Sequence, residues 1–140
     1  MSRYILHRIA EDFNVSISFA PKLFHDFNGS GAHINFSTRT MRSGTGGMDY
    51  INDMMTKMAA QHLEHMKMYG EGNSKRLTGV HETSSMTNFS FGVGNRNASF
   101  RIPTSTMHAR GKGYIEDRRP ASNIDPYLAT AMIVDTGILE

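Results

Sequence analysis

Cysteine is absent from this chain of 140 residues. Disulfide frameworks and thiolate metal sites are therefore excluded. The sequence also lacks any run of about 18 apolar residues, the length that a membrane-spanning helix needs. Its first residues are polar and do not resemble a signal peptide. From these absences we expect a cytoplasmic protein that does not bind a membrane.

The net charge is also small, at +2. A composition of 39% hydrophobic and 20% charged residues is typical of a folded domain or of part of one. The charge is unevenly placed, because six Lys and Arg residues lie between Arg96 and Arg119 against only Glu116 and Asp117. Such a stretch suits phosphate groups, or is simply a solvated basic face. It carries no recognised nucleic-acid-binding motif, so we expect no nucleic-acid partner.

Hydrophobic periodicity predicts a mixture of helices and strands without internal repeats. The clearest helix spans residues 49–69, where one helical stripe consists of Ile51, Met55, Met58, His62 and His65. Five of the 11 methionines lie in this span, which indicates adaptable core packing or, alternatively, a Met-rich groove for a partner. The predicted elements are helices over residues 2–13, 49–69 and 125–140, strands over 15–19, 32–38, 98–102 and 114–119, and loops over 21–28, 71–90 and 104–113.

The last of these helices has the clearest start signal. Asp125 is a suitable N-cap and Pro126 suits the first helical position. Its predicted apolar stripe consists of Tyr127, Ala131, Val134 and Ile138.

Two groups of polar residues have the chemistry of a binding site. Gly29 and Gly31 flank Ser30, so the backbone there can adopt positive φ and approach a ligand closely. The following His33 is either a metal ligand or a histidine satisfied within the core. Glu116 lies two residues before Arg118 on a predicted strand, so both side chains project from one face. That pair suits an ordinary salt bridge, or a site for a cation and an anionic group. His62 and His65, at i and i+3, have the spacing of a metal pair, but nothing further supports that role.

Four polar motifs together carry a family resemblance. They are residues Asn28–His33, Arg76–Ser84, Asn95–Pro103 and Tyr114–Pro120. In this order and spacing they resemble the C-terminal part of the catalytic domain of glutamine synthetase (glutamate–ammonia ligase) of the eukaryotic type. The resemblance extends from about Arg3 to Leu139. It implies an α+β fold, in which a partial antiparallel sheet carries the site and long helices pack on one face.

The resemblance also implies a role for individual residues. It assigns metal binding to His33 and Glu116, substrate binding to Asn28, Gly29, Arg76, Arg96 and Arg118, and nucleotide binding to Asn35, Ser37, Arg96, Ser99, Arg101 and Tyr114. Glu82, on a flap, would take a proton from bound ammonium, and Arg118 would orient the reacting group. The implied reaction joins ammonia to L-glutamate through a γ-glutamyl phosphate, with ATP as phosphate donor and Mg²⁺ or Mn²⁺ as cofactor.

The 140 residues match only part of that domain. The N-terminal β-grasp domain and the upstream strands that carry other metal-binding carboxylates are absent from them, and Ala20 and Phe27 depart from the family pattern. We therefore expect a partial catalytic domain over residues 1–140 that has no ligase activity in isolation. The complete protein is expected to form a homo-oligomer. The alternative is a catalytically inactive remnant that binds nucleotide or joins a glutamine synthetase oligomer.

Overall fold

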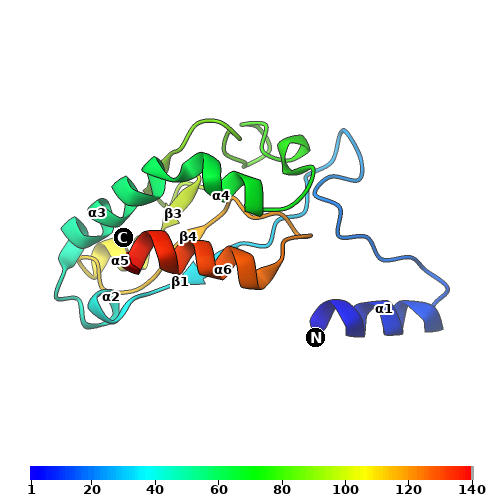
Figure 1. Ribbon diagram of the computed structural model, residues 1–140, viewed down its shortest axis with the longest axis horizontal. Helices are drawn as coiled ribbons and strands as arrows, with labels where there is room; N and C mark the ends of the chain where they lie inside the picture. Colours follow the sequence, from blue (N-terminus) through cyan, green and yellow to red (C-terminus); the bar gives the residue numbers. More distant parts are fainter. Residues whose placement is uncertain (140) are drawn as a thin grey trace.

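A small sheet forms the centre of the computed structural model, which describes residues 1–139 (Figure 1). Its strands are β1 (Ile34–Phe36), β2 (Phe91–Val93), β3 (Phe100–Ile102) and β4 (Ile115–Asp117). In space they follow the order β1-β4-β3-β2. Strand β4 is antiparallel to both β1 and β3, whereas β2 pairs in parallel with β3. The expected α+β class is therefore confirmed, with one parallel strand pair added to the antiparallel part.

Helices supply most of the remaining ordered chain. They are α1 (Ser2–Asp12), α2 (Arg39–Ser43), α3 (Gly47–Ala60), α4 (His62–Met68), η1 (Asn73–Lys75), α5 (Thr104–His108), α6 (Pro126–Val134) and the π-helical η2 (Asp135–Leu139). Helix α1 stands apart from the other elements and is joined to them by an extended segment (Figure 1). Helices α3, α4 and α6 lie alongside the sheet (Figure 1).

The core forms between one face of the sheet and these helices. Phe100 and Ile115 of the sheet pack against Met55 and Met58 of α3 and Ile133 of α6, and all five are buried. The methionines of the predicted stripe are thus core residues, as one reading of the sequence proposed. Because neighbouring residues of a strand point to opposite faces, the other sheet face is left for polar side chains.

Several local expectations were wrong. Residues 15–19 alternate in polarity but form no strand, and Val15 is exposed, because no neighbouring strand offers hydrogen bonds. The predicted helix 49–69 is divided at Gln61 into α3 and α4. Strand β2 and helices α2 and α5 are too short to show a hydrophobic period.

The last helix begins as predicted but buries a different face. Asp125 caps α6 by accepting hydrogen bonds from the backbone N–H groups of Tyr127 and Leu128 at 2.8 and 3.4 Å. The predicted stripe is wrong, because Tyr127 is 83% exposed and Val134 43% exposed. Ala129 and Ile133 are buried instead. The predicted end of this helix at Glu140 lies outside the described residues.

A second buried region is polar. Arg119 and Asp117 are fully buried and form an ion pair of 2.8 Å between Nη2 and Oδ2. Tyr69 donates a hydrogen bond of 2.7 Å to Asp117, while Arg119 donates to Nδ1 of both His62 and His65. We call these five residues the Arg119 network. The two histidines therefore have structural partners, and no group of three or more metal-ligating His, Asp or Glu side chains occurs within residues 1–139.

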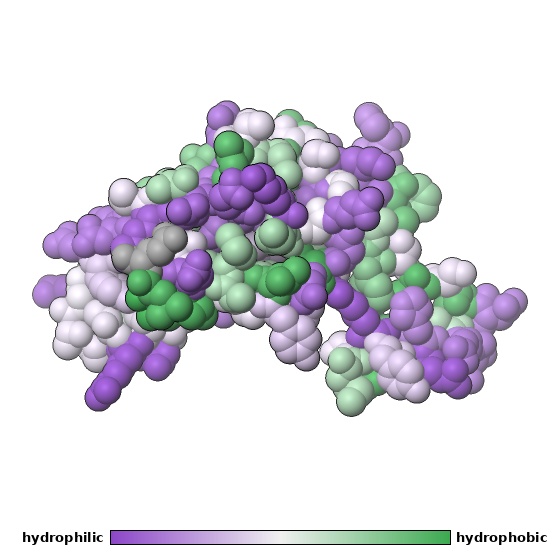
Figure 2. Space-filling view, viewed as in Figure 1, coloured by the Kyte–Doolittle hydropathy of each residue, from purple (hydrophilic) through white to green (hydrophobic). Residues whose placement is uncertain are grey.

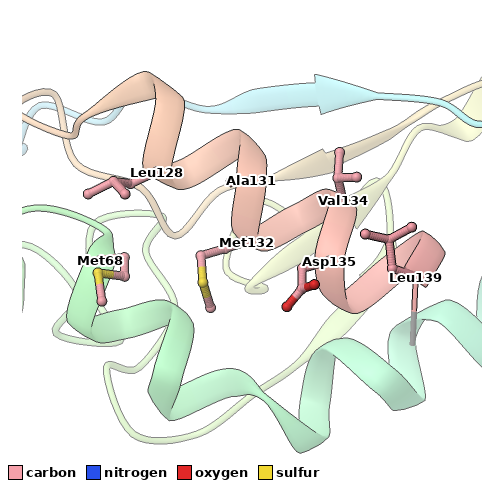
Figure 3. Close-up of a pocket in the computed structure, with 7 residues that line it drawn as sticks. All are labelled: Met68, Leu128, Ala131, Met132, Val134, Asp135 and Leu139. Atoms are coloured by element: carbon pink, nitrogen blue, oxygen red, sulfur yellow. The ribbon is translucent and has the colours of Figure 1, made fainter.

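Apolar side chains gather along α6 on the surface (Figure 2). Between α4 and α6 they line a groove of about 360 Å³ (Figure 3). Met68, Leu128 and Leu139 are among its lining residues and are each at least 43% exposed. None of the helices described over residues 1–139 is long and apolar enough to cross a membrane.

We predict that this groove makes the isolated chain self-associate. Covering a few hundred Å² of apolar surface contributes several kcal/mol at about 25 cal/mol per Å². The double substitution Leu128→Lys and Leu139→Lys should shift the chain towards monomer in analytical ultracentrifugation. Tyr127→Lys, on an exposed neighbour outside the groove, should leave self-association unchanged. A wild-type chain that sediments as a monomer at every concentration would contradict the prediction.

Candidate functional site

Polar residues form a row across the sheet face that points away from the core. Asn35 of β1 lies opposite Glu116 of β4, and Glu116 lies opposite Arg101 of β3. The alternation of side chains places their neighbours Ile115 and Phe100 in the core. The same alternation that builds the core therefore positions the polar row.

Glu116 is the centre of this row. Its Oε1 lies 3.2 Å from His33 Nδ1 and accepts a hydrogen bond of 3.3 Å from Arg118 Nη1. Its Oε2 accepts a hydrogen bond from Arg101 Nε. Burial disfavours the carboxylate, but the hydrogen bond from Arg101 and the charges of Arg118 and Arg101 outweigh burial and lower the pKa of Glu116. The carboxylate is therefore ionised at neutral pH.

His33 reaches Glu116 from the glycine-containing segment before β1. Burial and the charge of Arg118 lower the pKa of His33, so its imidazole is neutral at pH 7. Gly31 is needed for close approach, since a Cβ there would lie 2.8 Å from His33 Nε2. The expected positive φ is not found at Gly29 or Gly31. What these glycines provide is space.

Beside His33 lies a pocket of about 150 Å³. It brings together segments that are far apart in the sequence: the glycine-containing segment, the end of β4 and the loop after η1. Its lining residues are Asn28, Gly29, Gly31, His33, Arg76, His81, Glu82, Thr83 and Arg118. Six of the predicted site residues therefore share one cavity. His81 was missed by the sequence analysis, although it directly precedes Glu82.

Arg118 connects the pocket to two loops. Its Nη2 donates to the backbone carbonyl of Glu82 at 3.3 Å, and its Nε donates to that of Arg96 at 3.1 Å. The side chains of Arg96 and Glu82 form an exposed ion pair of 3.7 Å. His81 and Glu82 have φ angles of 55° and 56°, which non-glycine residues adopt at a cost of about 1 kcal/mol or more each. The loop carrying Glu82 is thus held over the pocket in a strained conformation.

Arg76 forms another wall of the pocket and is 4% exposed. Its Nη2 donates to three successive backbone carbonyls, those of Arg118, Arg119 and Pro120, at 3.2, 2.6 and 3.1 Å. Burial and then the charge of Arg118 lower the pKa of Arg76 to about 10, so the guanidinium remains charged at neutral pH. A Cβ at Gly29 would lie 2.5 Å from Arg76 Cγ, so only glycine fits there.

Other residues assigned by resemblance lie outside this pocket. Asn35 and Arg101 belong to the polar row. Tyr114 directly precedes Ile115, the first residue of β4, and is 39% exposed. Ser37 accepts a hydrogen bond from Arg42, at 3.1 Å. Ser99 is fully buried, and its hydroxyl accepts a hydrogen bond from the backbone N–H of Ser90 at 3.2 Å.

The residues present fall short of a complete cation site. A Mg²⁺ ion prefers about six oxygen ligands in octahedral geometry. Within residues 1–139 no three His, Asp or Glu side chains are placed to hold a metal ion together, and both Glu116 oxygens already accept hydrogen bonds from guanidinium groups. The arrangement instead concentrates positive charge, with four arginines around two glutamates.

Comparison with known proteins identifies the family. A family model described as "Glutamine synthetase, catalytic domain" matches residues 1–139. The chain is similar to glutamine synthetases of Eremothecium gossypii (57% identity over 97% of the chain), Saccharomyces cerevisiae (56% over 97%) and Agaricus bisporus (54% over 100%). It spans a little over a third of their lengths, 37%, 36% and 39%. These matches confirm the resemblance based on the four motifs: the chain belongs to the glutamine synthetase family and corresponds to part of its catalytic domain.

Proposed function

We propose that residues 1–140 are the C-terminal part of a catalytic domain that ligates ammonia to L-glutamate with ATP, giving L-glutamine. The supporting observation is the convergence of Glu116 and Arg101, from β4 and β3, with His33 before β1 and Arg118 after β4, next to a pocket containing Arg76. The complete enzyme would be a cytoplasmic homo-oligomer. Other parts of it would supply the rest of the active site.

In this proposal the pocket binds L-glutamate. Asn28 and Gly29 offer polar backbone and amide groups on one wall, and Arg76 offers a guanidinium on another. Guanidinium groups bind carboxylates through paired hydrogen bonds. Arg118, which lines the same pocket, would hold the reacting carboxylate beside the phosphate that it attacks.

The nucleotide phosphates would lie over the polar row. Arg96 and Arg101 would neutralise charge on the transferring phosphoryl group, the main task of protein side chains in this chemistry. Asn35, Ser37, Ser99 and Tyr114 would surround the rest of the nucleotide. Because the Ser99 hydroxyl is buried, its contribution would be to support the backbone between β2 and β3.

Glu82 would act as the general base. The carboxylate lies on the strained loop at the pocket rim, and Arg118 fixes the backbone carbonyl of the same residue. A base so placed would take a proton from bound ammonium and leave nucleophilic ammonia, which then displaces phosphate from the γ-glutamyl phosphate. The family generally uses ATP and divalent metals, and His33 and Glu116 would contribute two ligands to a Mg²⁺ or Mn²⁺ ion. Since these two ligands do not complete a coordination shell, no step is assigned to a metal held by this chain alone.

The proposal is tested by binding and by turnover. L-Glutamate added to the ¹⁵N-labelled chain should shift the amide signals of Asn28 and Gly29, and Arg118→Gln should weaken this binding about tenfold through loss of a charge-assisted hydrogen bond. Arg39→Gln, an exposed arginine outside the pocket, is the matched control and should leave binding unchanged. An absence of glutamate-dependent shifts, or equal losses in both variants, would contradict the proposed site. A γ-glutamyl hydroxamate assay of the isolated chain should show no ATP-dependent product, and measurable turnover would refute the inference that its site is incomplete.

A further inference from the structure

Behind the pocket lies the buried side-chain amide of Asn73. Asn73 is 1% exposed and does not line the pocket. Its Oδ1 accepts a hydrogen bond of 3.0 Å from Arg76 Nε. Its Nδ2 donates to the backbone carbonyls of Tyr69 and Arg119, at 3.1 and 2.8 Å. Both N–H donors and the carbonyl oxygen of this side chain are therefore engaged, so three of its four hydrogen-bonding positions are used.

The backbone of η1 brings these two residues together. The carbonyl of Asn73 accepts hydrogen bonds from the backbone N–H groups of both Arg76 and Leu77, each at 3.0 Å. This single turn places the Arg76 side chain over the Asn73 amide. Asn73 and Arg76 also share an acceptor, the carbonyl of Arg119, at 2.8 and 2.6 Å. The amide, the guanidinium and the end of β4 therefore form one closed set of hydrogen bonds.

These contacts leave one edge of the Arg76 guanidinium for the pocket. Nε is bonded to Asn73, and Nη2 is bonded to the three carbonyls after β4. Within residues 1–139 no hydrogen bond is recorded for Nη1, which lies beside Gly31. A planar group fixed at two of its three nitrogens has a fixed direction for the third.

We propose that Asn73 is a positioning residue that aims Nη1 of Arg76 into the pocket for an anionic ligand. This inference rests on the proposed function, because it takes the carboxylate of L-glutamate as that ligand. An aliphatic residue at position 73 would leave Nε of Arg76 buried without an acceptor. The guanidinium would then turn towards another acceptor, and Nη1 would no longer face the pocket.

The experiment observes the Arg76 Nε–H group directly by ¹⁵N NMR of the full chain, with the signal assigned by its loss in Arg76→Lys. In the wild type this proton should exchange slowly with water, because it is buried and hydrogen-bonded. In Asn73→Ala the exchange should accelerate about tenfold or more, as expected for the loss of a hydrogen bond to a charged group. Asn73→Asp keeps the acceptor for Arg76 Nε but replaces the donor to the carbonyls of Tyr69 and Arg119 by a second oxygen, so its exchange should be slower than in Asn73→Ala. Thr136→Val, which removes a buried hydrogen bond to His65, controls for general destabilisation and should retain slow exchange.

Binding of L-glutamate forms the second arm. Asn73→Ala should weaken it about tenfold, Asn73→Asp by less than Asn73→Ala, and Thr136→Val by less than about twofold. If the wild-type chain binds no L-glutamate, the proposed function fails while the exchange measurement still decides the role of Asn73. Slow exchange retained in Asn73→Ala would overturn the inference. So would exchange in Asn73→Asp as fast as in Asn73→Ala, because the acceptor for Arg76 Nε would then have no effect and Asn73 would act only as a structural residue.

Discussion

Arg119→Met should reduce the free energy of unfolding by about 3–5 kcal/mol, because it leaves the fully buried carboxylate of Asp117 without its cation. The guanidinium donates to Asp117 through Nε at 2.9 Å and through Nη2 at 2.8 Å, and its carbon lies 4.6 Å from the centroid of the Phe100 ring. Few interactions of a small domain exceed this effect, since a whole domain is stable by about 5–15 kcal/mol. Urea unfolding followed by circular dichroism measures the change.

Two variants make this result specific. The double variant Arg119→Met and Asp117→Leu removes both buried charges and should recover much of the loss. Arg8→Met breaks an exposed ion pair with Glu11 and should change stability by less than about 0.5 kcal/mol. If Arg119→Met cost no more than Arg8→Met, Asp117 would have to be solvated or neutral in the folded chain.

Acid should destabilise the fold through His65. Burial, followed by the charge of Arg119, lowers the pKa of His65 from its ordinary value of 6.5 to about 4. Its Nδ1 lies 3.1 Å from Arg119 Nη2 and 2.8 Å from Tyr69 Oη, and its Nε2 lies 2.8 Å from Thr136 Oγ1. A second proton on this buried ring would add a positive charge next to the guanidinium of Arg119. The surroundings therefore favour the neutral ring.

The sign and size of the effect follow from linkage. The unfolded chain binds a proton at His65 more readily than the folded chain, so stability is present above pH 6.5 and falls as the pH approaches 4. A difference of 2.5 pKa values corresponds to about 3 kcal/mol of unfolding free energy lost between pH 7 and pH 4. Urea unfolding at a series of pH values measures this slope, to which the lowered pKa values of His33 and His62 add in the same direction.

His65→Gln isolates the contribution of this one ring. The variant should be less stable at pH 7 but should lose about 3 kcal/mol less between pH 7 and pH 4. His25→Gln, on an exposed histidine, should reproduce the wild-type slope. An unchanged slope in His65→Gln would show that some other group governs the acid sensitivity.

Sequence patterns predicted the elements that bury a continuous stripe. The methionine-rich helix is an example, because Ile51, Met55 and Met58 repeat at helical spacing and all lie in the core. Hydrophobic patterns failed where the structure of a segment depends on the elements that it packs against or pairs with. Residues 15–19 alternate like a strand but have no pairing strand, and the face of α6 that is buried contains Ala129 rather than the larger Val134. Which face of α6 is buried depends on where α3 and α4 lie, and the hydrophobic periodicity of α6 alone does not contain that information.

The site was predicted in part for a similar reason. Glu116 and Arg118 lie on one face because strand alternation is local, and His33 reaches them because β1 pairs with β4. The resemblance brought His33 and Glu116 together by assigning both to metal binding, whereas the pairing of β1 with β4 is seen only in the structure. Asn73 and His81 escaped the sequence analysis, since a buried amide and a histidine on a loop have no pattern of their own. Their places beside the pocket became visible only from a hydrogen bond to Arg76 and from the pocket wall.

Strand β4 has a further consequence for folding. The strand ends with two acids, Glu116 and Asp117, and two arginines follow it, Arg118 and Arg119, so that one acid–arginine pair lies on each face. Sliding the strand by one residue would exchange the two pairs but leave an acid beside an arginine on both sides. Electrostatic attraction therefore discriminates weakly between the correct alignment and its nearest competitor. The correct alignment is therefore selected mainly by Ile115, which is fully buried and would be moved out of the core by a shift of one residue. A polar residue at this position would favour chains trapped with the strand mispaired.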